Sequence, residues 1–356
     1  ITHTMLDDII HFQENHPWIV LTIFLSLTIA MIPGMQGVET IVALENMMPA
    51  SSEPVQAFND LRDLGLGKDT VAIKLTAGTE DNGVSSLAAD KAKAYSEAVS
   101  ERLRNVEDIT SAQPPHKTGF IDDAKRTGVI IAQTGVGDNG EQMSRVFNDI
   151  QEATQYDKPE GIETTITGVP AVQQRLADMV QTDKNLTTLI SLILVFLLTL
   201  ALFRGSITAA VMPIIVVLLS IVWLYGTMGY LGIPLSTLAG SVAALVIGIG
   251  IDYAVHILNT YRYHRRHGES MRDALDKAVG QTGVAILATS ITTISAFLAF
   301  LTGAMPEMHR FGLIMAIGIA YALIFSFLLL PAIFIIEEQL THKVYNALKE
   351  RFDHEA

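Results

Sequence analysis

The sequence contains no cysteine among its 356 residues. Disulfide bonds, thiol catalysis and cysteine-based metal sites are therefore excluded. Charged residues are also scarce, at 17%, whereas hydrophobic residues make up 49% of the chain and the mean hydropathy is +0.36. A chain of this length and composition is too apolar for one ordinary soluble domain. The composition predicts a membrane protein with two or more structural units.

Several function classes have no support in the sequence. Acidic residues outnumber basic ones by 37 to 24, and the resulting net charge of −13 argues against a nucleic acid partner. The long polar segment at 36–185 has His116 as its only histidine, and it has no metal-ligand spacing, nucleophile elbow or phosphate-binding glycine loop. We therefore expect no enzymatic activity, no cofactor and no metal site.

Six stretches are apolar and long enough to cross a bilayer as helices, which takes about 20 residues. About 150 mainly polar residues separate the first stretch from the second, whereas short links join the others. The predicted domains are 1–35 with the first span, the polar domain at 36–185, a five-span bundle at 186–336 with a link at 260–282, and a tail at 337–356. The six stretches are residues 17–35, 186–203, 207–229, 236–259, 283–303 and 310–336.

The distribution of Lys and Arg predicts the orientation. The link at 260–282 and the tail at 337–356 are rich in these residues, whereas the links at 230–235 and 304–309 have none. Because basic loops stay on the cytoplasmic side, both chain ends are predicted to be cytoplasmic, in a multi-pass protein of the cell membrane. The 36–185 domain is then extracytoplasmic. Its 24 acidic and 14 basic residues are typical of an ordinary solvated surface.

The 36–185 domain has a readable order of strands and helices. Residue alternation and helical periodicity predict the order βαββαβ, which is the split βαβ pattern of ferredoxin-like folds. A short helix is expected at 53–64, a cap of the first long helix at Ser85 or Ser86, and a helix at 170–185 leading into the second span. The predicted strands are 69–77, 106–113, 127–136 and 162–169, and the predicted helices are 86–105 and 140–155.

A carboxylate interrupts the fourth apolar stretch, which reads VIGIGIDYAVHIL at 246–258. Such a group costs about 2.5 to 3.5 kcal/mol at the middle of a spanning helix, and it usually marks an ion or proton path. Gly248, Asp252 and His256 recur every four residues and therefore share one helix face. Asp252 is expected to lie roughly 10 Å deep. On the fifth stretch, Thr289, Thr292 and Thr293 form a polar stripe at a similar depth.

Each of these residues also has an ordinary structural explanation. Asp252 could be a permanently paired or protonated packing residue, and His256 could extend to the membrane surface. The threonine hydroxyls could donate to carbonyl groups of their own helix. Tyr253 could be a packing aromatic, and Gly248 and Gly250 are expected to allow close helix packing.

Three segments carry a family resemblance: GIGIDYAVHIL at 248–258, ESMRDALDKAVGQTG at 269–283 and AILATSITTISAFLAFL at 285–301. They resemble the fourth span, connecting helix and fifth span of the resistance-nodulation-division superfamily, in its MmpL, hopanoid-exporter and Patched-like branch. The resemblance implies a six-span α-helical bundle with an extracytoplasmic, porter-type α+β domain. It also implies export of hydrophobic or lipid-like molecules driven by the proton-motive force, with Asp252 and Tyr253 as the proton-relay pair.

Members of that superfamily typically contain two such repeats, whereas this chain has one. A homodimer would supply the second copy most economically, and a homotrimer is the alternative. Two other functions stay open: a lipid-binding regulator similar to sterol-sensing domains, and a protein-export accessory similar to the Sec-associated branch. The sequence does not decide between protons and sodium ions.

A route for the cargo is suggested by the segment that follows the first span. Its apolar residues are expected to lie near the outer membrane surface, where flexible methionines suit irregular apolar ligands. The partners would then be membrane lipids or hydrophobic small molecules, although ordinary core packing also explains the pattern. The residues concerned are Ile41, Val42, Leu44, Met47 and Met48.

Overall fold

The structure is a computed structural model that describes residues 10–40, 69–78, 86–135, 140–236 and 238–355, with a few further positions between 49 and 60. Residues 39–180 form one compact unit, and the rest of the chain forms another. The five residues of the suggested cargo route and most of the helix predicted at 53–64 lie outside the described residues. The outcome for these two predictions is therefore left open.

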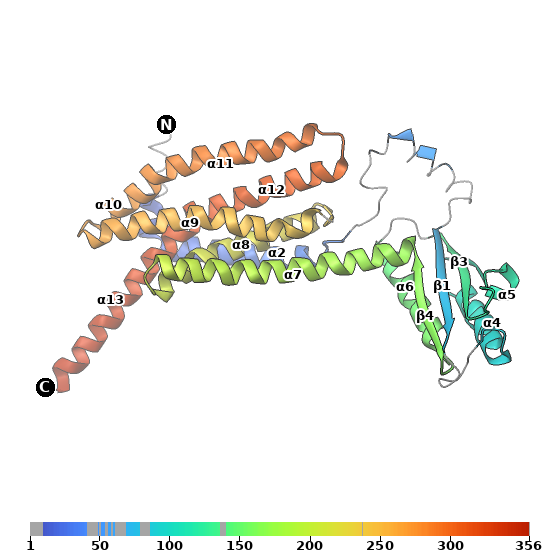
Figure 1. The fold of residues 1–356 in the computed structure, drawn as a ribbon. Coiled ribbons are helices and arrows are strands. Elements are labelled where there is room, and N and C mark those ends of the chain that lie inside the picture. The colour runs from blue at the N-terminus through green and yellow to red at the C-terminus, as the bar shows by residue number, and fades with distance from the viewer. Residues whose placement is uncertain are drawn as a thin grey trace. The chain divides into compact units, whose positions relative to one another are not determined.

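The smaller unit is built on one antiparallel sheet with the strand order β2-β3-β1-β4 (Figure 1). The predicted order of strands and long helices is confirmed, with one short additional helix, α5, between β2 and β3. The elements are β1 (Asp69–Ala77), α4 (Asp90–Arg104), β2 (Ile109–Gln113), α5 (Pro115–Thr118), β3 (Thr127–Thr134), α6 (Gly140–Gln155) and β4 (Ile162–Gly168).

The start of α4 differs from the predicted one. The helix begins at Asp90, and the residue at its N-cap is Ala89, which offers no side-chain cap. The Ser86 hydroxyl instead accepts a hydrogen bond from the Ala88 N–H at 3.2 Å. A serine can close such a local turn as readily as it caps a helix, so the expected cap at Ser86 is wrong.

One face of the sheet packs against α4 and α6. On β1 the side chains of Val71, Ile73 and Leu75 are buried, whereas Lys74 between them is exposed. Successive strand residues point to opposite faces, so the alternation seen in the sequence becomes one apolar face. The helices complete this core with residues that are buried at helical spacing, including Val99, Leu103, Val146 and Ile150.

We expect Ile73→Ala to destabilise this unit by about 3 kcal/mol, because it leaves a cavity in a fully buried position. Hydrogen exchange of the β1 and β3 amides in the intact chain would measure the loss of protection. Lys74→Ala on the exposed face of the same strand is the matched control, and we expect almost no change there. Equal effects of the two substitutions would contradict this account of the core.

Within the described residues, six helical segments are long and apolar enough to cross a membrane. They are Pro17–Gln36, Val169–Leu202, Ile207–Tyr230, Leu238–Arg266, Met271–Thr302 and Pro306–Thr341. Each covers one of the predicted spans to within two residues, so there is one candidate helical segment for each predicted span, in the predicted order. The first three segments are helices α2, α7 and α8. Helix α9 (Val242–Arg266) forms most of the fourth segment, and α11 (Gly283–Leu298) forms half of the fifth. The sixth segment includes α12 (Pro306–Ile324) and the start of α13 (Leu330–Glu355).

Glycine allows α2 and α8 to pack closely. A Cβ atom built on Gly229 would overlap the carbonyl oxygen of Gly34, and one built on Gly226 would lie 2.7 Å from Met31. Real Cβ atoms do not approach so closely, so glycine is required at both positions of α8. Near this crossing, the Trp223 indole N–H donates to the Thr28 hydroxyl at 2.9 Å. Small residues at a helix crossing are typical of membrane bundles.

Candidate functional site

One face of α9 belongs to the core of the bundle. Val246, Ile247 and Ala254 are buried on this face, and so is Tyr253, which is 6% exposed. A Cβ atom built on Gly250 would lie 2.7 Å from the Ala322 Cβ on α12. Gly250 therefore permits the close contact between α9 and α12.

The opposite face of α9 is exposed and polar. From Gly248 to the end of the helix, every exposed position is either glycine or carries a hydrogen-bonding group. We define the polar face of α9 as Gly248, Asp252, His256, Asn259 and Tyr263. Exposed positions on α7 are very different, since they include Leu186, Leu189, Ile190, Ile193, Leu194, Leu197, Leu198 and Leu202.

Asp252 and His256 are in contact on the polar face and form an ion pair when the imidazole is protonated. The distance from His256 Nε2 to Asp252 Oδ1 is 3.3 Å, and the two side chains are 59% and 67% exposed, respectively. A carboxylate facing lipid would be costly, and a neighbouring imidazole reduces the cost only in part. An imidazole can also accept and donate protons near neutral pH. The pair therefore has the chemistry of a proton-exchange site, provided that water or another protein surface covers it.

Tyr253 does not share this position. Adjacent residues of a helix point about 100° apart, and Tyr253 lies on the buried face while Asp252 lies on the exposed one. The structure thus brings Asp252 together with His256 rather than with Tyr253. Any relay between Asp252 and a tyrosine would have to involve a residue of another chain or a change of conformation.

The three threonines of α11 donate to carbonyl groups of their own helix. Thr289 donates to Ile286 at 3.0 Å, and Thr292 and Thr293 donate to Ala288 and Thr289 at 2.9 Å. Among the residues that the structure describes, none of these hydroxyls bonds to Asp252, and α12 packs against both α9 and α11. The three hydroxyls thus make the hydrogen bonds within the helix that the structural explanation of this stripe expects, and their part in a relay stays a prediction.

Gly248 has open space beside it. Of all atoms in the described part of the chain, none outside its own helix lies within 4 Å of a Cβ atom built there. The expected close approach of a neighbouring helix at Gly248 thus has no partner among the described residues. This position has room for a helix of another molecule.

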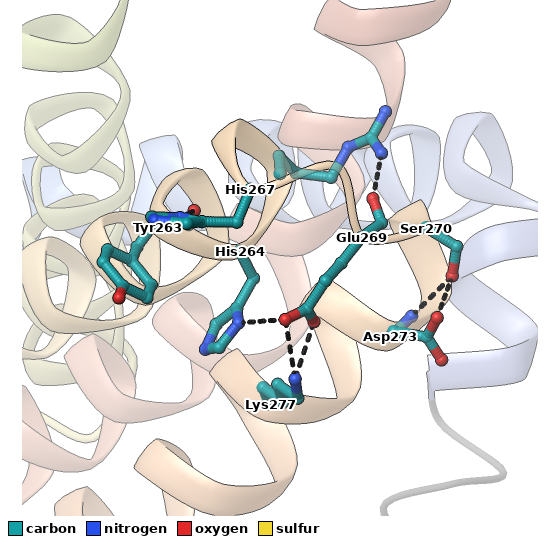
Figure 2. Close-up of polar contacts among 8 residues, drawn as sticks. Tyr263, His264, His267, Glu269, Ser270, Asp273 and Lys277 are labelled. Atoms are coloured by element: carbon teal, nitrogen blue, oxygen red, sulfur yellow. Dashed lines mark hydrogen bonds and ion pairs between the residues drawn. The ribbon is translucent and has the colours of Figure 1, made fainter.

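A second polar cluster, at the basic end of α9, was not predicted from the sequence (Figure 2). The carboxylate of Glu269 lies 2.8 Å from His264 Nδ1, and Lys277 Nζ donates to both of its oxygens at 2.7 and 2.8 Å. The hydrogen bond from Lys277, followed by that from His264, lowers the pKa of Glu269. Its ionised form therefore stabilises the fold above its ordinary pKa of 4.5, and this contribution is lost as the pH falls through the lowered value.

The last helix is tied to the same end of α9. The Glu338 carboxylate on α13 accepts a hydrogen bond from the Tyr261 hydroxyl at 2.7 Å and forms an ion pair with Arg265. Arg265 also donates to the backbone carbonyl of Glu269. The Lys and Arg residues of the link predicted its side of the membrane, but the sequence could not show which residues pair, because the partners lie on three different elements.

These features define a class. Six candidate membrane-spanning helices, a small antiparallel sheet and an ionisable pair within one of these helices are the features of a multi-pass membrane protein. The chain belongs to the MMPL family, whose sequence model matches residues 46–341, and it is therefore a membrane protein of the resistance-nodulation-division kind.

Its relatives differ in length. A membrane protein of Methanocaldococcus jannaschii is 28% identical over 97% of this chain and 97% of its own length. Membrane protein YdfJ of Bacillus subtilis is 24% identical over 75% of the chain, and the transport protein MmpL8 of Mycobacterium bovis is 23% identical over 90% of it. These matches span only 36% and 30% of the two bacterial proteins. The archaeal relative therefore has a similar size, whereas the chain spans about a third of the bacterial ones.

Proposed function

We propose that the protein exports hydrophobic or lipid-like molecules across the cell membrane, driven by the proton-motive force and working as a homo-oligomer. In this proposal both termini are cytoplasmic, and residues 36–185 form an extracytoplasmic domain of the ferredoxin-like porter type. The observation that carries the proposal is the polar face of α9, which places an exposed Asp252–His256 pair on a membrane-spanning helix.

The polar face of α9 supports assembly because its contact with lipid hydrocarbon is unfavourable. Each hydrogen-bonding group that faces hydrocarbon without a partner costs free energy, and the cost is larger for a charged group. Gly248, on the same face, leaves room for the backbone of a second helix. A second copy that packs here around a two-fold axis would cover both pairs and place two carboxylates near one another. A homotrimer could cover the same face with a different geometry.

Asp252 is the proton-binding group in this proposal. Its carboxylate takes up a proton from the extracytoplasmic side and passes it to the imidazole of His256, which releases it toward the cytoplasm. The two protonation states differ in charge on the polar face and therefore favour different packing of the copies. That difference couples proton movement to the conformation of the cargo path. Membrane lipids or other apolar molecules are the expected cargo.

Cross-linking through Gly248 tests the assembly. The chain has no native cysteine, so Gly248→Cys introduces a single reactive site. We expect a short thiol-reactive cross-linker to join two copies in native membranes, because the small side chain would lie at the interface. Ile193→Cys, on the apolar exposed face of α7, is the matched control and should stay uncrosslinked. Monomer for both variants at every protein density would rule out an interface on the polar face.

A further inference from the structure

The polar face of α9 continues well beyond the ion pair. Asn259 and Tyr263 follow Asp252 and His256 at spacings that keep all four on one side of the helix, and His267 comes one turn later at the end of α9. All five side chains are exposed within the single chain. Each can donate a hydrogen bond, and each can accept one in at least one of its protonation or tautomeric states.

The spacing suits a chain of water molecules. Neighbouring side chains three or four residues apart on a helix have Cβ atoms about 5 to 6 Å apart. Where the polar atoms of two such side chains do not meet directly, one water can bridge them. The closer Asp252–His256 contact, at 3.3 Å, forms the end of the series that lies deepest in the membrane.

At the basic end of α9, the series meets the cluster drawn in Figure 2. The rings of Tyr263 and His267 lie 4.3 Å apart, and His267 Nδ1 is 2.8 Å from the Tyr263 carbonyl oxygen. On the other side of Tyr263, the His264 ring binds Glu269. The charged groups around this end are Arg265 and Arg266 of α9, Glu269 of the link, Lys277 of the following π-helix and Glu338 of α13.

These charges favour proton release to water at this end. Glu269 is already engaged by Lys277 and His264, and Glu338 by Arg265, so both carboxylates are neutralised by fixed partners. His267 lies outside these pairs and is exposed. Tyrosine phenols ordinarily titrate only at about pH 10. Beyond Tyr263, His267 is the next ionisable group that continues the line of the polar face and is exposed.

We propose that the polar face of α9 is a water-filled proton path, which runs from Asp252 through His256, Asn259 and Tyr263 to an exchange site at His267. The conduction of protons along this path depends on the proposed proton-driven export, whereas the presence of water along the path does not. In the assembled protein this face is covered by a second copy only in part, so that water reaches it from the basic end of α9. No atom is gained or lost along the path, because protons pass along the bridging water molecules and each titratable group takes up one proton and passes one on. The Asn259 amide does not titrate and instead holds these waters by hydrogen bonds.

Cysteine accessibility tests the path without any transport assay. A thiol reacts as the thiolate, whose amount falls about tenfold for each unit by which an apolar environment raises its pKa. We expect Asn259→Cys, His256→Cys and Tyr263→Cys, each in the otherwise cysteine-free full chain, to react with a small water-soluble thiol reagent in membrane vesicles. The rate of His256→Cys should exceed that of Leu198→Cys by about tenfold or more.

Leu198 is a suitable control for His256 because the two positions are similar in depth. Leu198 lies five residues before the end of the predicted second span at 203, and His256 lies three residues before the end of the predicted fourth span at 259. Leu198 is exposed on the apolar face of α7. If His256→Cys reacts as slowly as Leu198→Cys, the path is overturned, even if transport is proton-driven. Fast reaction of His256→Cys relative to Leu198→Cys supports it, even if the cargo proves to be different.

Asn259 gives the sharpest test of proton passage. Asn259→Leu removes the hydrogen-bonding group at the middle of the path while adding apolar surface, and Asn259→Gln keeps the amide. We expect the leucine variant to slow proton release from vesicles, followed with an enclosed pH-sensitive dye, by about tenfold or more, and the glutamine variant to retain most of the rate. Equal rates for all three proteins would overturn the role of Asn259 in the path.

Discussion

Asp252→Asn should abolish transport driven by a proton gradient, while the protein stays folded, inserted and oligomeric. Asparagine keeps the shape of the side chain but cannot bind and release a proton. The exposed position of Asp252 means that the substitution disturbs no buried contact within the chain. We expect the gradient-dependent rate to fall by about two orders of magnitude or more, as when a group that transfers protons is removed. Tyr253→Phe should have a smaller effect, because Tyr253 lies on the buried face of α9.

The measurement is gradient-driven movement of a fluorescent lipid in proteoliposomes that contain equal densities of each variant. A matched sodium gradient shows whether the ion is a proton. One elementary charge moved through the whole membrane field supplies about 2.3 kcal/mol per 100 mV, so a modest imposed gradient should give a measurable bias. If wild type and Asp252→Asn show equal gradient-dependent rates, Asp252 is a packing residue and the proposed coupling is wrong.

His256→Gln offers a complementary comparison. Its imidazole lies 3.3 Å from the Asp252 carboxylate, and glutamine retains hydrogen bonding without titrating near neutral pH. A loss of rate at His256→Gln with the Asp252 carboxylate intact would separate proton transfer through the imidazole from proton binding by the acid.

The elements that followed directly from the sequence are those with a strong local period. The alternating residues of β1 predict a strand with one buried face and one exposed face. The long apolar runs predict helices that cross the membrane. Element ends were less certain: the polar side chain of Ser86 closes a turn before α4 instead of capping the helix. Such ends depend on differences of about 0.5 to 2 kcal/mol between alternative local hydrogen bonds.

The candidate site was predicted only in part, for a geometric reason. A four-residue spacing placed Asp252 and His256 on one face correctly, since the helix period alone determines that. The same period separates Tyr253 from Asp252, although the two are adjacent in sequence. The Glu269 cluster depends on where the link, the π-helix and α13 meet, which no local pattern encodes. Residues from one helix can thus be grouped from sequence, whereas residues from several elements cannot.

Two glycines of the bundle should respond in opposite ways to the same substitution. At Gly229 on α8 a side chain would overlap the backbone of Gly34 on α2, and backbone atoms cannot move aside without separating the two helices. We expect Gly229→Leu to destabilise the bundle by about 3 kcal/mol or more, with a large loss of monodisperse protein. Gly248 on α9 has open space beside it within the chain, so Gly248→Leu should leave the fold of each copy intact.

Gly248→Leu should nevertheless weaken the assembly strongly. If a second helix approaches at Gly248, four added heavy atoms prevent that approach and uncover the Asp252–His256 pair next to it. We expect the oligomer of wild-type protein in nanodiscs or mild detergent to become monomer in Gly248→Leu, as seen by native mass spectrometry. The thermal stability of that monomer should stay close to that of wild-type monomer, in contrast to Gly229→Leu. An oligomer that persists in Gly248→Leu would place the interface elsewhere, because no packed two-fold contact at the polar face of α9 could accept a leucine at this position.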